Sequence, residues 1–549
     1  MYSVVQKICR YWNTLRHLKL VQIVGRIQHR LLKVRVDQSI FQGKKRALSI
    51  HWVQPALRSR RMIERNTFCF LNEKHEVVNK GDWNNEKYSK LWLYNLHYFD
   101  DLTAIDAGRR IVWHSDFIHR WVRENPPGMG NGWEAYPLSL RIVNWIKWSL
   151  SGNQLNAASL HSLVVQTRFL SKTIEVYLLG NHLFANAKAL LFVGLFFEGD
   201  EAQSWYDIGR SIIEKELLEQ VLEDGGNFEL STMYHLIFLE DLLDLVNIQR
   251  TFSSKPLRAI EDAIPKMIYW LINMCHPDGE ISFFNDAALG ITPSVEELFR
   301  YAERLGFRLH TEPSLGIVDL SASGYSRVSL GNNVVVLIDR AAIGPDYLPA
   351  HAHADSLSFE LSIFGQRVIV NSGTSVYGNG RERQRQRGTG AHSTIVIDGV
   401  NSSDVWGGFR VGRRARVSLH ESYELSKNFF LSACHDGYKH LSGKPIHKRD
   451  WFISKSLVEI KDFISGSGFH DIEATFPLHP SVEIVNITRN SAILYVDGKQ
   501  IKVLFFGLGV LAQEKSTYHP EFGLTVYNYK LVYRLSARLP INIITRIYW

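Results

Sequence analysis

Two histidines stand two residues apart immediately before a predicted strand. His351 and His353 precede residues 356–363, where apolar and polar residues alternate with the period of two of a half-buried strand. A tight turn and a second apolar run then return Asn371 to the same end of the sheet, and His392 comes from the next strand. In extended backbone both histidines point to one side. One imidazole could therefore move a proton, while the other could hold an ion with Asn371 and His392.

An adjacent amide and imidazole open a predicted helix further upstream. Asn181 and His182 directly follow Gly180, and the helical apolar spacing continues to residue 197. The start of a helix carries the positive end of its dipole, so this pair can cradle the carboxylate of a ligand. Asn181 could equally be a plain helix N-cap.

A tyrosine begins another predicted helix just after a loop that carries a carboxylate. Tyr234 and His235 follow Glu229, and Asp286 lies at a later turn. A tyrosine that removes a proton needs a pKa below its ordinary value of about 10. Neighbouring cations could lower that pKa, and four are expected on one loop: Arg381, Arg383, Arg385 and Arg387.

The composition is that of a folded protein with several cores. The chain has 549 residues, of which 45% are apolar and 21% charged, so two or three domains are expected. Its four cysteines are far apart and form no Cys-x-x-Cys pair, which argues against a disulfide framework and against a thiolate zinc site: Cys9, Cys69, Cys275 and Cys434.

The net charge of +8 is concentrated at the N-terminus, where eight lysines and arginines precede the first acidic residue, Asp37. The remaining chain is balanced, which argues against a nucleic-acid-binding body. Residues 1–35 lack the cleavage site of a secretory signal, and Lys19 and Arg26 interrupt any membrane span. We expect either a solvated helical arm packed on the body or a basic amphipathic helix that contacts anionic lipid or a partner.

The period of the apolar residues changes once along the chain. Helical spacing dominates as far as about residue 306, and short alternating strands follow from about residue 316. Helix hairpins of this kind stack into a solenoid or close into an α/α toroid, and the strands predict an antiparallel β-sandwich. We therefore predict an α+β multidomain protein with an arm over 1–37, an α/α toroid over 38–310 and a sandwich over 311–549.

Aromatic residues favour a sugar ligand. Eleven of the fourteen tryptophans precede residue 310, and flat aromatic faces stack on the C–H surfaces of pyranose rings. The alternative for each tryptophan is packing between helices.

Several motifs, in this order, resemble the heparinase II/III-like polysaccharide lyases and related alginate lyases. They are NHLFANAKAL, EDGGNFELSTMYH, HPDGEISFFND, PAHAHADSLSFEL, AHSTIVIDG and WGGFRVGRRARV, and the likeness spans most of residues 90–480. The resemblance implies a toroid, a sandwich and a substrate cleft between them. It also implies a bacterial cell-envelope or periplasmic location, with a cytoplasmic one as the alternative.

The resemblance assigns roles to individual residues. It makes Asn181 and His182 the carboxylate-neutralising pair, Tyr234 the catalytic tyrosine and His351 its partner. It makes His353, Asn371 and His392 the ligands of a zinc or other divalent cation. An amide oxygen at position 371 replaces the usual aspartate and is a poorer zinc ligand. We assign substrate contacts to Trp133, Glu134, Tyr136, Arg141, Glu229, His235 and Arg387.

The implied reaction is β-elimination at a uronic acid in an acidic polysaccharide. The C5 proton becomes removable once the adjacent carboxylate is neutralised, and an acid then protonates the leaving O4 oxygen. Tyr234 is a candidate for either role or both, with His351 as partner. The alternatives are a non-catalytic polysaccharide-binding or assembly protein of a bacterial exopolysaccharide pathway, and a glycoside hydrolase that uses paired carboxylates such as Glu229 and Asp286.

Overall fold

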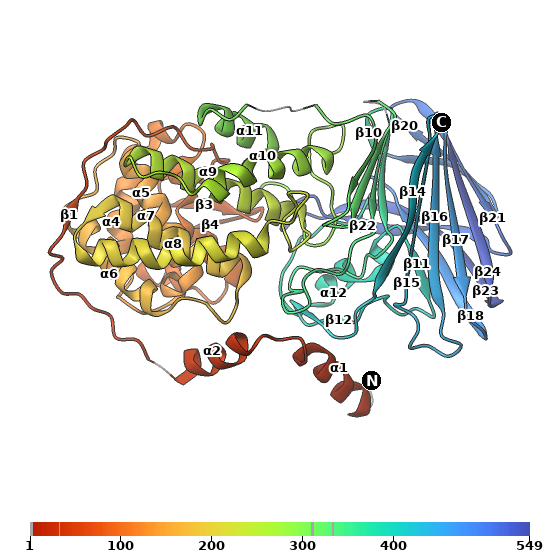
Figure 1. Cartoon of the computed structure of the whole chain (residues 1–549), viewed down its shortest axis with the longest axis horizontal. Helices are drawn as coiled ribbons and strands as arrows, with labels where there is room; N and C mark the ends of the chain where they lie inside the picture. Colours follow the sequence, from red (N-terminus) through yellow and green to blue (C-terminus); the bar gives the residue numbers. More distant parts are fainter. Residues whose placement is uncertain (1–3, 32, 309–311, 332–333) are drawn as a thin grey trace.

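The computed structural model describes residues 4–31, 33–308, 312–331 and 334–549. A helical part and a strand-rich part lie side by side along the long axis, and the N-terminal arm runs beneath both (Figure 1). The arm consists of α1 (Val4–Leu15) and α2 (Leu20–Leu31). The change of apolar period therefore marks the change of architecture, as predicted.

Among the residues that the structure describes, the helical part contains nine α-helices: α3 (Lys90–Tyr98), α4 (Ile111–Glu124), α5 (Ala135–Leu150), α6 (Ala157–Lys172), α7 (Gly180–Phe196), α8 (Asp200–Gln220), α9 (Thr232–Thr251), α10 (Arg258–Asn273) and α11 (Val295–Arg304). Almost every side chain of α7 is buried, because its residues are apolar or small on all sides and it packs on α5, α8 and α9. The start of α7, with Asn181 and His182, is thereby held in place by the interior of the helical part.

A small antiparallel sheet precedes the first helix of the helical part. It is formed by β2 (Met62–Glu64), β3 (Thr67–Phe70) and β4 (Glu73–Glu76). Phe68 and Phe70 face the helical core from this sheet. A two-stranded pair also joins β1 (Lys44–Lys45) to β5 (Phe197–Glu198). These strands are too short for their periodicity to be read from the sequence.

The strand-rich part contains three main antiparallel sheets. One has five strands in the order β10-β9-β8-β7-β6, one has eight in the order β14-β15-β16-β17-β24-β21-β20-β19, and one has four in the order β11-β18-β23-β22. Their facing side chains form a core of aliphatic and aromatic residues, among them Phe359, Trp451 and Ile460. The bounds are β6 (Gly316–Leu320), β7 (Tyr325–Ser329), β8 (Val334–Asp339), β9 (Phe359–Ile363), β10 (Gln366–Ile369), β11 (Ile395–Ile397), β14 (Val417–Leu425), β15 (Asn428–His435), β16 (Ile446–Ser454), β17 (Leu457–Ser465), β18 (Phe469–Pro477), β19 (Glu483–Ile487), β20 (Ser491–Val496), β21 (Lys499–Phe506), β22 (Val510–Tyr518), β23 (Val526–Arg538) and β24 (Ile541–Tyr548).

A short hairpin and a short helix interrupt this part of the chain. The hairpin pairs β12 (Val405–Trp406) with β13 (Arg410–Val411). The arginine-rich segment, expected to be a loop, is the helix α12 (Arg381–Arg387). Arginine, glutamine and glutamate are good helix formers, and Glu382 pairs with Arg385 one turn later, which accounts for the helix.

The predicted boundary between residues 310 and 311 lies outside the described residues. On either side of it, the last helix is α11 and the first strand is β6. Within the described part of the chain, no helix combines the length and the apolar character that a bilayer crossing requires.

Candidate active site at the domain junction

A cluster of chemically active side chains lies where the helical part meets the strand-rich part. The helical part contributes the starts of α7 and α9 and the turn at Asp286. The strand-rich part contributes the segment before β9, with His351 and His353, and helix α12. Residues far apart in sequence therefore meet at one place.

Tyr234 and His351 are in direct contact across this junction. Their rings stack with centroids 3.7 Å apart and an angle of 29° between the planes. Tyr234 lies in the first turn of α9, where its backbone N–H donates to the N-cap hydroxyl of Ser231. Its hydroxyl lies 3.0 Å from the hydroxyl of Tyr377. Tyr234 of the helical part thus contacts both His351 and Tyr377 of the strand-rich part.

Burial raises the pKa of the Tyr234 hydroxyl well above its ordinary value, and neighbouring Tyr377 and Asp286 add to the effect. The expectation that the arginines of residues 381–387 would lower this pKa is therefore wrong for the free protein. The positive charge of Arg383 is neutralised by Asp286, so it does not favour a phenolate. Tyr234 is consequently a proton donor in the free protein.

His351 is held by carboxylates on both ring nitrogens. Its Nδ1 lies 3.0 Å from Oδ2 of Asp286, and its Nε2 lies 3.4 Å from Oε2 of Glu229. A hydrogen bond between Nδ1 and Asp286 leaves Nε2 on the side of Glu229. Only 8% of the residue is exposed. This fixed orientation suits a group that accepts a proton at Nε2.

Asp286 is the anion around which the cluster is built. Its carboxylate contacts His351, His353 (2.9 Å to Nε2) and the guanidinium of Arg383 (2.7 Å between Nη2 and Oδ2). Burial alone would raise the pKa of Asp286, but Arg383 and the two histidines hold it well below its ordinary range. Both carboxylate oxygens are thus occupied by partners from the other domain.

Asn181 and His182 lie in the first turn of α7, with Leu179 as the N-cap. Asn181 is therefore not the N-cap; its backbone N–H donates to Oε1 of Glu229 at 3.3 Å. His182 contacts Glu175 (3.0 Å) and packs on Tyr136, and 31% of its side chain is exposed. Burial acts to lower the pKa of His182, but the charges of Glu175, Glu229 and Glu134 and the hydrogen bond to Glu175 together raise the pKa above its ordinary value. The imidazolium form is favoured, which suits a carboxylate ligand.

Glu229 links the Asn181 side of the cluster to the His351 side. It is 4% exposed, and burial raises its pKa. Of the remaining residues predicted to contact substrate, Glu134 and Tyr136 lie nearest the His182 side. Glu134 accepts from Tyr94 and pairs with Lys90 at 3.0 Å.

Four residues predicted to contact substrate lie inside the protein with protein partners. Arg141 donates to Gln166 and to backbone carbonyls beneath Trp121, and Trp133 packs on Trp121. His235 bonds to the carbonyl of Met267 and stacks on Trp270. Arg387 donates to carbonyls of Ala352 and of residues 407–410. The structure places these four residues around the cluster rather than in it: Trp133, Arg141, His235 and Arg387.

A second group of side chains, the His/Asp/His group, lies beside the first. Atoms of His353, Asp355 and His392 that could bind a metal all lie within 4.8 Å of one another. Asn371 is adjacent, and its Oδ1 lies 2.8 Å from Nδ1 of His392. The carboxylate within ligand reach is that of Asp355, which the sequence reasoning did not consider. Asn371 instead orients the His392 ring.

This group fits a divalent cation. Neither Nδ1 of His353 nor Nε2 of His392 has a hydrogen-bond partner among the described residues, although both rings are almost fully buried. Burial lowers the pKa of His353 to about 4 and that of His392 to about 3, so both rings are neutral and have a free lone pair. Two neutral imidazoles and a carboxylate are a donor set that zinc accepts.

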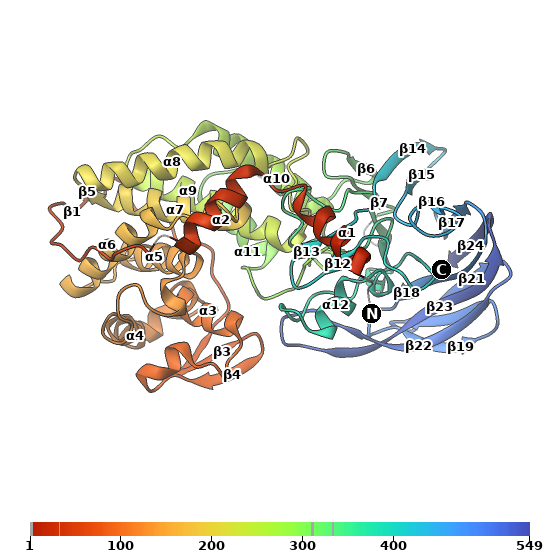
Figure 2. The same cartoon turned by 90° about the horizontal axis from the view of Figure 1, so that it is seen from below.

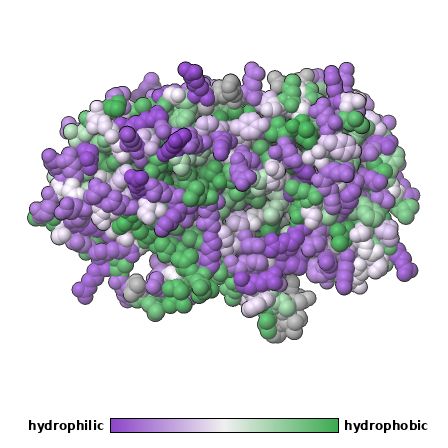
Figure 3. Space-filling model, in the orientation of Figure 1, coloured by the Kyte–Doolittle hydropathy of each residue, from purple (hydrophilic) through white to green (hydrophobic). Residues whose placement is uncertain are grey.

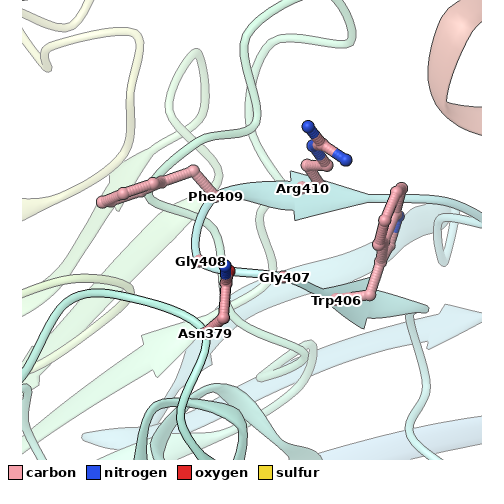
Figure 4. A pocket seen from close by; sticks show the side chains of 6 residues that line it. All are labelled: Asn379, Trp406, Gly407, Gly408, Phe409 and Arg410. Atoms are coloured by element: carbon pink, nitrogen blue, oxygen red, sulfur yellow. The ribbon is translucent and has the colours of Figure 1, made fainter.

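A pocket of about 360 Å³ adjoins the cluster along the β12–β13 hairpin. Figure 4 shows Phe409 and Trp406 on opposite sides of its Gly407–Gly408 turn, with Arg410 above the strand. Phe409 reaches the cluster, since its ring centroid lies 6.0 Å from that of His351 and 5.0 Å from that of Tyr377. Sequence reasoning missed Tyr377 and Phe409, because glycine-rich loops carry no periodicity that would place their side chains.

The comparisons with known proteins agree with this architecture. Residues 83–305 match the family model described as heparinase II/III N-terminus, and residues 312–543 match heparinase II/III-like, C-terminal. An α/α toroid followed by an antiparallel β-sandwich is the architecture of this group of proteins, and the chain belongs to the heparinase II/III-like family.

The individual relatives share only about a quarter of the aligned residues with this chain. A heparin-sulfate lyase of Bacteroides stercoris is 27% identical over 357 residues, which are 60% of this chain and 50% of that protein. One of Pedobacter heparinus is 25% identical over 358 residues, 58% of this chain and 49% of that protein. The chain thus spans about half the length of these curated relatives.

Solved structures share the fold. The crystal structure of heparinase III aligns with a TM-score of 0.71 and 19% identity, covering 86% of this chain and 80% of that one. The heparan sulfate lyase HepC of Pedobacter heparinus aligns with a TM-score of 0.59 and 19% identity, covering 88% and 81%.

Proposed function

We propose that this protein is a polysaccharide lyase that cleaves a uronic-acid-containing polysaccharide by β-elimination. The observation that carries the proposal is the stacked pair of Tyr234 and His351 at the domain junction. This pair combines a protonated hydroxyl with an imidazole that is fixed by Asp286. Asn181 and His182 lie next to Glu229, which contacts His351.

The residues divide the reaction among themselves. His182, favoured as imidazolium, and the amide of Asn181 neutralise the uronate carboxylate so that negative charge can delocalise into it. Nε2 of His351 takes the C5 proton. The Tyr234 hydroxyl gives its proton to the O4 leaving group as the C4–O4 bond breaks and the C4–C5 double bond forms. Tyr234 then regains a proton from solvent, and the His351 imidazolium releases the C5 proton to solvent, which restores both groups.

An acidic polysaccharide is the substrate class that these groups fit. The two curated relatives carry the name heparin-sulfate lyase, which supports a sulfated or carboxylated sugar chain. The pocket along the β12–β13 hairpin offers the exposed ring of Phe409 and the exposed cation of Arg410. A pyranose ring can stack on the first, and its acidic group can pair with the second.

A glycoside hydrolase would need two free carboxylates, and one of the two candidates here is already bound. Both oxygens of Asp286 are bound by Arg383 and the histidines, so this residue is not available to activate water. A non-catalytic binding protein would keep the cluster but release no product.

A product assay separates these functions. Incubation with heparan sulfate, chondroitin sulfate and alginate, read by absorbance of the C4–C5 double bond in the ultraviolet, should detect an unsaturated product from at least one of them. New reducing ends without that absorbance would identify a hydrolase. Binding with neither signal would identify a non-catalytic protein.

We further propose that His353, His392 and Asp355 hold a divalent cation, with zinc as the first candidate. Such an ion would supply positive charge beside Asp286 and fix His353 in position.

Purified protein should contain close to one equivalent of metal by inductively coupled plasma mass spectrometry. His392→Ala should lose most of it, because one of three protein ligands is removed. His75→Ala, a histidine outside this group, is the matched control and should keep its metal. Equal metal content in all three proteins, or none in native protein after incubation with zinc, would contradict the site.

A further inference from the structure

The N-terminal arm attaches to the body through its polar side chains. The guanidinium of Arg10 pairs with Asp404 at 2.5 Å, and the hydroxyl of Thr14 accepts from the Trp406 indole N–H at 3.2 Å. On α2, the amide of Gln22 donates to the carbonyl of Tyr347 at 3.1 Å. Gly25 permits close approach, since a Cβ there would lie 2.9 Å from Cβ of Tyr177. The contacts of the arm with the protein are therefore made mainly by polar or small residues, together with one edge of the half-exposed Tyr11 ring, which packs on Trp406.

The opposite side of the arm is apolar and faces solvent. Trp12 is 65% exposed, Leu20 79% and Leu31 75%. The exposed residues recur at three- and four-residue intervals, so each helix has one continuous apolar stripe: Ile8, Tyr11, Trp12 and Leu15 on α1, and Leu20, Ile23, Val24, Ile27 and Leu31 on α2. Figure 3 shows apolar surface gathered over α2 at the lower edge of the molecule. We call these nine residues the apolar stripe.

Exposed cations flank the apolar stripe. Lys7, Arg26, Arg30, Lys33 and Arg35 are all exposed, and the sequence has no acidic residue before Asp37. A helix that places its polar face on its own protein and its apolar face in water is the reverse of an ordinary packed helix. An apolar surface of this extent indicates a partner, and the cations indicate that the partner is anionic.

We propose that the arm binds the surface of an anionic phospholipid bilayer, with α1 and α2 lying in the interface. The apolar stripe would enter the boundary between headgroups and acyl chains, with Tyr11 and Trp12 at the level that aromatic residues favour. The cations would pair with the phosphate groups around it.

Other occupants satisfy only part of this surface. An acidic polysaccharide would pair with the cations but leave the apolar stripe in water. A second copy of the chain would cover the stripe but would bring two sets of cations together without acidic residues to balance them.

The arm also fixes how a membrane-bound molecule would present its active site. Seen from below, α2 lies in front of the helical part and α1 in front of the strand-rich part (Figure 2). Trp406, which bonds to Thr14 on the arm, also lines the pocket beside Phe409. The pocket would therefore lie close to the membrane surface. The membrane proposal itself does not depend on the lyase reaction.

Vesicle sedimentation with the full chain tests the proposal. Native protein should pellet with vesicles of phosphatidylcholine and phosphatidylglycerol, and much less with phosphatidylcholine alone. The triple variant Trp12→Glu/Leu20→Glu/Ile27→Glu should lower the partition coefficient by about tenfold or more, because it places three carboxylates in the buried face. Leu508→Glu, which changes an equally exposed leucine (82%) on the sandwich, should bind like native protein.

A charge variant tests the contribution of the cations. Arg26→Gln/Arg30→Gln/Lys33→Gln should reduce binding to phosphatidylglycerol vesicles and make it less sensitive to salt. Circular dichroism and thermal unfolding should match native protein for every variant, since all these side chains face solvent. Native protein that fails to pellet with anionic vesicles would overturn the proposal. So would a dimer in sedimentation velocity that the glutamate triple variant converts to monomer, or retention on immobilised alginate that only the charge variant loses.

Discussion

Tyr234→Phe is expected to reduce turnover by a factor on the order of 10² or more while leaving the fold and the affinity for polysaccharide nearly unchanged. The substitution removes only the hydroxyl, which burial keeps protonated and which we propose protonates the leaving O4 oxygen. The aromatic ring remains stacked on His351. Initial rates of ultraviolet absorbance, measured on whichever substrate the native protein cleaves, give kcat and KM separately. The loss should appear in kcat.

Tyr325→Phe is the matched control for this experiment. Tyr325 is also fully buried, but its hydroxyl donates to the backbone carbonyl of Leu230 and does not reach His351. Loss of that hydrogen bond should cost about 1 kcal/mol of unfolding free energy and little activity. If Tyr234→Phe retained native kcat, or if both variants lost activity equally, the proposed role of Tyr234 would have to be given up.

Asp286→Asn is expected to destabilise the protein by roughly 3–5 kcal/mol, because it leaves a buried arginine without its counter-charge. Arg383 is completely buried, and its guanidinium bonds directly to the Asp286 carboxylate. Asparagine keeps the shape but not the charge, and its amide has one accepting oxygen in place of the two that Arg383 and the histidines share. Denaturant unfolding followed by circular dichroism measures the change.

Glu382→Gln is the matched control for Asp286→Asn. It also replaces a carboxylate by its amide, at the residue next to Arg383 in α12. Glu382 pairs with Arg385, and both side chains are more than one third exposed. Water can replace such a pair, so the loss should be below about 1 kcal/mol. An Asp286→Asn variant as stable as Glu382→Gln would show that Arg383 finds other partners and that the cluster is not held together by charge.

Much of the architecture could be predicted because it depends on periodicity. Up to residue 306 the apolar residues have the spacing of a helix with one buried face, and after residue 316 they alternate as in a strand with one buried face. The structure forms helices and strands accordingly. The short strands β2–β4 and the helix α12 were not predicted, because each contains too few residues to show a period.

The candidate site was predicted less completely than the fold. Asn181, Tyr234 and His351 could be found because their residue types stand at the starts of elements, and the structure brings them together. Asp355 was missed as a ligand candidate, since its carboxylate faces His353 and His392 only after the loop before β9 has folded. Arg387 and His235 could not be placed, because a sequence does not say which polar residues turn inward to satisfy backbone carbonyls.

The carboxylate of Asp286 connects the two halves of the molecule, so it limits how far they could be exchanged separately. The residue belongs to the helical half of the chain, yet His351, His353 and Arg383, which neutralise it, all belong to the other half. At this junction, neither half alone contains both members of the Tyr234–His351 pair or both the buried anion and its counter-charge. The two halves are consecutive in the chain, but neither can be exchanged without the other. A chimaera that joined one half to its counterpart from a relative would have to transplant this junction intact before either half could work.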